Sequence, residues 1–101
     1  MSAQILVVDD DTNTLDGYLD FLAGAGFVVD GAADGATALT LAFKHPPSAI
    51  VTDIELPGLD GFALAETLRD DPRTRQIPVL GLTGHWSAAI GHRATRQAWP
   101  R

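Results

Sequence analysis

Short aliphatic runs alternate with amphipathic segments along most of the chain. Four runs rich in β-branched and aliphatic residues predict buried strands, at residues 4–8, 27–30, 48–52 and 77–82. Between these runs, apolar residues recur at the spacing of an amphipathic helix. Strands that alternate with helices in this way predict right-handed crossovers and a parallel sheet covered on both faces. We therefore expect an α/β fold with a doubly wound parallel sheet.

Cap and breaker residues mark the ends of the predicted helices. Asp11 or Thr12 can cap the first helix, which Gly26 ends. Asp34 can cap the second, and the prolines at positions 46 and 47 forbid its continuation. After the third helix and the fourth strand the pattern weakens, although residues 87–98 could form one more helix. The apolar faces expected for the three helices are Leu15, Tyr18, Leu19 and Leu22; Ala38, Leu39, Ala42 and Phe43; and Phe62, Leu64, Ala65 and Leu68.

Polar residues stand where three of the predicted strands end. In an open α/β sheet, ligands bind beyond the carboxyl ends of the strands. Carboxylates that converge there repel one another unless a cation lies between them. Oxygen ligands without His or Cys favour Mg²⁺, which commonly bridges to phosphate, so the pattern predicts phosphoryl chemistry. The residues concerned are Asp9, Asp10 and Asp11 after the first strand, Asp53 after the third and Thr83 after the fourth.

Length, charge and composition narrow the function classes. At 101 residues the chain is expected to form one domain, and without cysteine it has neither disulfides nor thiolate chemistry. No apolar run approaches the roughly 20 residues of a membrane span, so we expect a cytoplasmic protein with no membrane partner. The net charge is -6, and all 13 acids lie at or before Asp71, which argues against a nucleic-acid partner. The basic tail beyond residue 85 could touch an acidic surface, but a solvated helix face is the favoured interpretation.

Three segments of the chain resemble the receiver domain of bacterial two-component response regulators. They are residues 5–11 (ILVVDDD), 51–61 (VTDIELPGLDG) and 78–84 (PVLGLTG), and the resemblance covers residues 4–84. The segment from Asp53 to Gly61 is the most specific, because the acceptor Asp, the Pro of the following turn and an Asp-Gly helix start recur in the family at this spacing. The resemblance implies a flavodoxin-like fold over a single domain of residues 1–101, with an atypical tail at 85–101.

The resemblance also implies a role for each polar residue. Asp53 would accept a phosphoryl group from a sensor histidine kinase, a phosphotransfer protein or a small phosphodonor, so the domain would signal rather than act as an enzyme. Asp10 would bind Mg²⁺ directly, Asp9 mainly through a metal-bound water, and Asp53 through one carboxylate oxygen. The backbone carbonyl of Glu55 would complete the metal site. Thr83 would donate its hydroxyl to the phosphoryl group when the domain switches.

Structural roles compete with these functional ones. Helix capping is an alternative for Asp9 and Asp10, and it is the favoured role for Asp11 and Asp60. Asp53 could instead be a turn residue and Thr83 a strand-end residue. The histidines are expected to be ordinary surface residues; they are His45, His85 and His92.

The chain departs from the family pattern near its C-terminus. Receivers continue into a fifth strand ending in Lys-Pro and a fifth helix, whereas this sequence stops at Arg101 and has one lysine, Lys44, at the end of the second helix away from the acids. We therefore expect a shortened receiver with impaired switching. The fourth strand would become an edge that pairs with a second copy in a homodimer, unless the tail covers it.

Two other functions remain as alternatives. The chain could be a receiver relic that no longer switches and acts as an interaction or dimerisation module. More remotely, the acids after the first strand resemble those of haloacid-dehalogenase-like phosphatases. That family needs a Thr where Asn13 stands, a downstream Lys and a later acidic pair, yet no acid follows Asp71.

Overall fold

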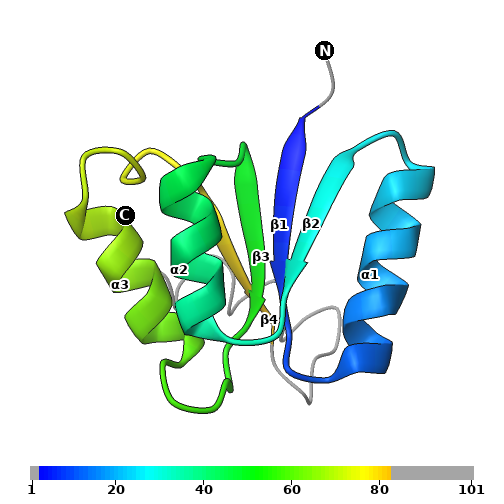
Figure 1. The fold of residues 1–101 in the computed structure, drawn as a ribbon, viewed down its shortest axis with the longest axis horizontal. Helices are drawn as coiled ribbons and strands as arrows, with labels where there is room; N and C mark the ends of the chain where they lie inside the picture. Colours follow the sequence, from blue (N-terminus) through cyan, green and yellow to red (C-terminus); the bar gives the residue numbers. More distant parts are fainter. Residues whose placement is uncertain (1–2, 83–101) are drawn as a thin grey trace.

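The structure is a computed structural model that describes residues 3–82, and its strands and helices alternate (Figure 1). The described strands form one sheet in the order β2-β1-β3-β4, with parallel pairing throughout. The predicted parallel α/β architecture is therefore confirmed for this part of the chain. Thr83, the tail at 85–101 and the possible helix over 87–98 lie outside the described residues. The elements are β1 (Gln4–Val8), α1 (Thr12–Gly24), β2 (Val28–Ala32), α2 (Gly35–Lys44), β3 (Ala49–Asp53), α3 (Gly61–Asp70) and β4 (Val79–Leu82).

The helices lie on both faces of the sheet (Figure 1). Alternating residues of a strand point to opposite faces, and Ala32 and Gly31 show the two sides. Ala32 belongs to the core formed with α2 and α3. A Cβ placed on Gly31 would instead lie 3.0 Å from the Leu19 side chain of α1. The sheet is thus doubly wound, with α1 on one face and α2 and α3 on the other.

The main core lies between the sheet and the α2–α3 pair. Leu64 and Leu68 of α3 are almost wholly buried, as is Ile50 at the centre of β3. Such residues are stabilised by the removal of apolar surface from water, about 25 cal/mol for each Å². The fully and nearly buried members of this cluster are Leu6, Val8, Ala32, Ala38, Ala42, Ile50, Leu56, Leu64 and Leu68.

Each helix between residues 3 and 82 begins at an aspartate cap. Asp11 accepts hydrogen bonds from the backbone N–H groups of Asn13 and Thr14, at 3.0 and 3.3 Å. Asp34 accepts from the N–H of Thr37 at 2.7 Å, and Asp60 from that of Ala63 at 2.8 Å. The capping roles expected for Asp11, Asp34 and Asp60 are confirmed. None of the helices in the described residues is long and apolar enough to span a membrane.

The structure corrects several expected details. β2 runs to Ala32 rather than ending at residue 30, because its pairing with β1 continues to the end of both strands. β4 begins at Val79, two residues later than expected, since the N–H of Ile77 closes a turn on Thr74. Phe62 was expected on the apolar face of α3 but is 43% exposed. It precedes Leu64 by two positions, which places it about 200° around the helix.

We predict that a buried threonine anchors the C-terminal end of α3. Thr74 is 1% exposed, and its hydroxyl donates to the carbonyl of Leu68 at 2.6 Å. Thr74→Val keeps the side-chain shape but removes this donor, and should lower the free energy of unfolding by about 1–2 kcal/mol in urea denaturation. The matched control is Thr67→Val, whose exposed hydroxyl donates to Ala63 at 2.9 Å and whose loss should cost less than about 0.5 kcal/mol. Equal losses in the two variants would contradict this role for Thr74.

Candidate functional site

Three carboxylates meet at the carboxyl ends of β1 and β3. Val8, the last residue of β1, pairs with Thr52, so the residues that follow each of them emerge side by side. One oxygen from each of Asp9, Asp10 and Asp53 lies within 4.8 Å of the others. Among the described residues this is the only such group of metal-binding side chains. The predicted convergence of these three acids is present.

Backbone amides hold two of the three carboxylates in place. Asp9 is 8% exposed, and its Oδ1 accepts a hydrogen bond from the N–H of Asp11 at 2.9 Å. The N–H of Asp9 donates to the carbonyl of Ala32 at 3.1 Å, which ties the residue to the end of β2. Asp53 is partly buried, and its Oδ1 accepts from the N–H of Glu55 at 3.1 Å. The site is therefore built on strand ends rather than on a free loop.

The surroundings of Asp9 and Asp53 disfavour the negative charge on their carboxylates. Burial is the main cause that raises the pKa of both Asp9 and Asp53, and their carboxylate neighbours raise it further. Hydrogen bonds from the amides of Asp11 and Glu55 act in the opposite direction without cancelling the shift. Burial also raises the pKa of Tyr18, with added effects of the charges on Asp9 and Asp53. A cation placed among the acids would offset the repulsion between their negative charges.

The donor set fits a small, hard divalent cation. Carboxylate oxygens suit Mg²⁺, which binds them at about 2.0–2.1 Å, so two ligands on opposite sides of the ion lie about 4.2 Å apart. The oxygens of the three acids lie within 4.8 Å of one another, so the site is close to the size that a small divalent cation needs. The ion pair found among the described residues, Arg73 with Asp71 at 2.8 Å, involves none of the three acids.

Two predicted site residues remain, Glu55 and Thr83. Glu55 directly follows the site in the chain, and its side chain is exposed while its amide holds Asp53. Thr83 lies outside the described residues.

Tyr18 lies near the site, although the sequence predicted it only as a residue of the apolar face of the first helix. Helical spacing showed that it faces the sheet, but its proximity to the charges on Asp9 and Asp53 depends on tertiary structure.

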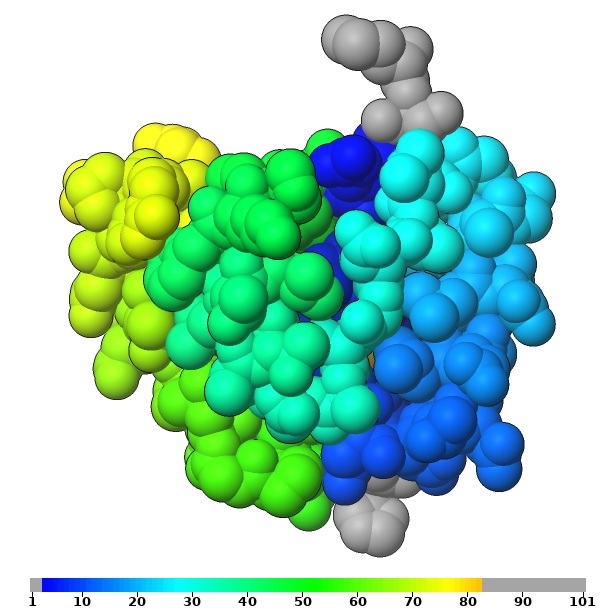
Figure 2. All heavy atoms as spheres, viewed as in Figure 1, coloured from blue at the N-terminus to red at the C-terminus, as the bar shows by residue number. Residues whose placement is uncertain are grey.

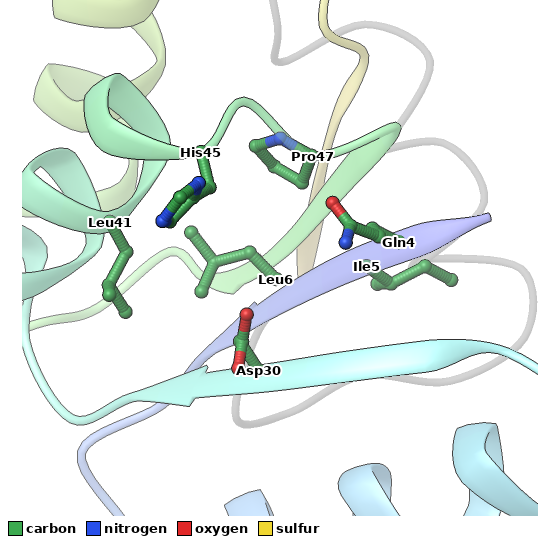
Figure 3. A pocket seen from close by; sticks show the side chains of 7 residues that line it. All are labelled: Gln4, Ile5, Leu6, Asp30, Leu41, His45 and Pro47. Carbon is green, nitrogen blue, oxygen red and sulfur yellow. The ribbon is translucent and has the colours of Figure 1, made fainter.

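A small pocket lies at the end of the sheet opposite the acids (Figure 3). It encloses about 20 Å³, room for about one water molecule and far too little for a cofactor. His45 is on its rim and is exposed, as expected for a surface histidine. The pocket is lined by Gln4, Ile5, Leu6, Asp30, Leu41, His45 and Pro47.

Comparisons with known proteins agree with the geometry. Residues 5–98 match the family described as response regulator receiver domain. The chain is 43% identical over 83 residues to the response regulator PleD of Caulobacter vibrioides, which covers 82% of this chain and 18% of PleD. It is 39% identical over 80 residues to the transcriptional regulatory protein HprR of Escherichia coli, covering 79% of this chain and 34% of HprR. The chain thus spans only a minor part of these relatives.

A solved structure shows the same fold. The chemotaxis response regulator CheY4 of Vibrio cholerae superimposes with a TM-score of 0.82 at 29% sequence identity. The superposition covers 95% of this chain and 80% of that one.

We predict that neutralising Asp53 stabilises the metal-free protein at neutral pH. A carboxyl whose pKa is raised by folding binds protons more tightly in the folded state, so its ionisation destabilises the fold as pH rises through the raised pKa. In urea denaturation with a chelator, Asp53→Asn should unfold at higher urea than the wild type at neutral pH. The gain in stability should vanish below pH 3.8, the ordinary pKa of the carboxyl group.

Asp71→Asn is the control with the opposite sign. The Arg73 side chain lowers the pKa of Asp71 to about 2, so its charge stabilises the fold above its ordinary pKa of 3.8. Neutralising it should therefore lower stability at neutral pH. A loss of stability in Asp53→Asn would contradict the electrostatic account of the site.

Proposed function

The chain belongs to the response regulator receiver domain family of two-component signalling, and on that premise we propose that Asp53 accepts a phosphoryl group in a Mg²⁺-dependent reaction. One observation carries the proposal: Asp9, Asp10 and Asp53 bring their carboxylate oxygens within 4.8 Å of one another at neighbouring strand ends. An ion held there needs only the side chains of these residues, the backbone carbonyl of Glu55 and water.

Asp53 is placed to act as the nucleophile. Its Oδ1 accepts a hydrogen bond from the amide of Glu55 at 3.1 Å, and within residues 3–82 no group donates to its Oδ2. An oxygen of Asp53 attacks the phosphorus of the donor, the bond from phosphorus to the donor breaks, and the donor leaves with the electron pair. The product is an aspartyl phosphate. Bound Mg²⁺ would neutralise the charge that gathers on the phosphoryl oxygens.

Asp9, Asp10 and Thr83 have supporting roles in this proposal. Asp10 is exposed and close to Asp53, which suits a direct ligand. Asp9 is buried and hydrogen-bonded, which suits contact through a metal-bound water. Thr83 directly follows β4, whose Leu82 carbonyl accepts from the N–H of Ile54, the residue after Asp53, at 2.7 Å. Its hydroxyl would donate to the phosphoryl group.

The phosphorylated state is proposed to be less stable than in family members with a lysine partner. Within these 101 residues Lys44 is the one lysine. It is the last residue of α2, at the end of the sheet opposite the acids. A phosphoryl group without a lysine lacks a charge-assisted hydrogen bond worth about 1.5–3 kcal/mol. Switching would be impaired to that extent.

The proposed phosphoryl source is a sensor histidine kinase or a phosphotransfer protein, as family membership implies. A cytoplasmic location, and the absence of nucleic-acid and membrane partners, stay predictions. A receiver relic that only binds partners is the second candidate, because the single lysine is remote from the site.

We predict that acetyl phosphate with Mg²⁺ adds one phosphoryl group, on Asp53, which mass spectrometry of the intact protein and its peptides will locate. Asp53→Asn should abolish the adduct, as should removal of Mg²⁺ by a chelator. The control is Asp60→Asn, a neighbouring exposed residue whose asparagine still caps α3, and it should be phosphorylated like the wild type. An adduct that persists in Asp53→Asn would contradict the assignment. No adduct in a wild type that binds Mg²⁺ would favour the relic.

We further propose that a second copy of the chain pairs along β4. In the described part of the chain β4 has a neighbour on one side only, β3. Leu80, in the middle of β4, is 44% exposed. An edge strand with exposed apolar residues offers unpaired amides and carbonyls to another chain. Two copies related by a twofold axis would pair through one isologous contact.

We predict that light scattering gives at least twice the chain mass of 10.7 kDa. Leu80→Lys should reduce the mass to that of one chain, because a charge on an edge strand opposes pairing. Val28→Lys is the matched control: Val28 is 48% exposed on β2, the opposite edge of the sheet, and its substitution should leave the mass unchanged. A wild-type monomer at high concentration would contradict the proposal.

A further inference from the structure

The segment between β2 and α2 touches both sides of the acidic site. On one side, the carbonyl of Ala32 accepts the N–H of Asp9 at 3.1 Å. On the other, Gly35 packs against Leu59, which lies in the loop of residues 54–60 that follows Asp53. Ala32 and Gly35 are both buried, and Asp34 between them caps α2 through Thr37. This segment, residues 32–35, therefore bridges the two halves of the site.

The contact between Gly35 and the loop has no room for a side chain. A Cβ on Gly35 would lie 2.6 Å from the carbonyl oxygen of Leu59 and 3.0 Å from both its Cβ and its Cδ2. Real Cβ atoms are not found at 2.6 Å from a backbone oxygen, and a backbone atom cannot swing aside as a side-chain end can. Figure 2 shows the first turn of α2 and the loop after β3 in contact on the surface.

The rest of the loop is anchored at its two ends. The N–H of Ile54 donates to Leu82 at 2.7 Å, and the N–H of Gly61 closes the loop on the carbonyl of Ile54 at 2.9 Å. Leu56 is 6% exposed and belongs to the core. The outer part of the loop includes Gly58, with φ of 74°, and its contact with α2 is made through Leu59. Leu59 follows Glu55 by four positions in this loop, which the hydrogen bond between Gly61 and Ile54 closes.

We propose that Gly35 is a positioning residue for the acidic site: its lack of a side chain lets the 54–60 loop close against α2 and so sets where the backbone of Glu55 and the carboxylate of Asp53 lie. The proposal rests on the proposed function insofar as Glu55 supplies a metal ligand. Gly35 itself touches neither metal nor phosphoryl group. Its effect passes through Leu59 to Glu55, whose amide holds Asp53 at 3.1 Å.

The direct test is Gly35→Ala, read first in the metal-free protein by amide NMR. The resonances of the 54–60 loop should move, while those of α1 should not. Mg²⁺ titration by calorimetry should then show affinity reduced by about 10- to 100-fold, the usual loss when a supporting contact of a metal site is broken. The matched control is Gly17→Ala, because Gly17 is a helix glycine whose added Cβ would meet nothing within 4 Å. It should change neither the loop resonances nor the Mg²⁺ affinity.

A second variant keeps the proposal testable if Gly35→Ala fails to fold. Leu59→Ala leaves the room at Gly35 intact but removes the side chain that packs on it. It should shift the Glu55 and Asp53 amides and weaken Mg²⁺ binding severalfold. Unmoved loop resonances and wild-type Mg²⁺ affinity in a folded variant would overturn the positioning role. A wild type that binds no Mg²⁺ would count against the proposed function instead, and the metal-free resonances would still decide the role of Gly35.

Discussion

The parallel register of β1 and β3 is the constraint on which the site depends. Val8 faces Thr52 across the two strands, so the next residues of each strand must emerge together at the same edge of the sheet. The residues at that edge are acids, and the surrounding fold partly removes Asp9 and Asp53 from water. Burial and like charge both raise the pKa of Asp9 and Asp53. The fold thus holds an unfavourable arrangement of charge in place through its backbone pairing.

That arrangement lowers the stability of the metal-free fold but favours the binding of a cation. The metal-free protein would be more stable with neutral residues at these strand ends, because neighbouring carboxylates repel one another. A divalent cation bound among the carboxylates would offset this repulsion, and a phosphoryl group, itself negatively charged, would need that cation beside it. The amides of Asp11 and Glu55 each donate a hydrogen bond to one of these carboxylates, Asp9 and Asp53, which favours the orientation that keeps the two close together. Arrangements that are locally unfavourable for stability, such as clustered carboxylates, are expected at functional sites.

Much of this could be predicted from the sequence, because it follows from local patterns. Aspartates at positions 11, 34 and 60 begin helices in the structure as the capping pattern predicts. The order of strands and helices follows from the alternation of apolar runs, and the acid cluster follows from the strand ends. Strand limits were less accurate: β2 gains Gly31 and Ala32 through pairing with β1, which no local propensity encodes.

Features that depend on distant contacts could not be predicted. Gly35 looks like an ordinary residue after a cap, and the reason for glycine there is Leu59, more than twenty positions later. Thr74 stands in a polar turn, yet its hydroxyl is buried against the end of α3. Phe62 fits an apolar pattern by composition but lies to the side of the buried stripe of its helix. In each case tertiary packing decides the role.

We expect a divalent cation to relieve the repulsion among the three clustered carboxylates. The most direct measurement is the thermal midpoint of unfolding with Mg²⁺, compared with NaCl at the same ionic strength, in the wild type and in Asp10→Asn. Asp11→Asn serves as the control, since asparagine also caps a helix and Asp11 is outside the cluster. Mg²⁺ should raise the midpoint of the wild type and of Asp11→Asn well above the midpoint in NaCl, and Asp10→Asn should lose most of this gain. Equal effects of Mg²⁺ and NaCl on the wild type would contradict this expectation.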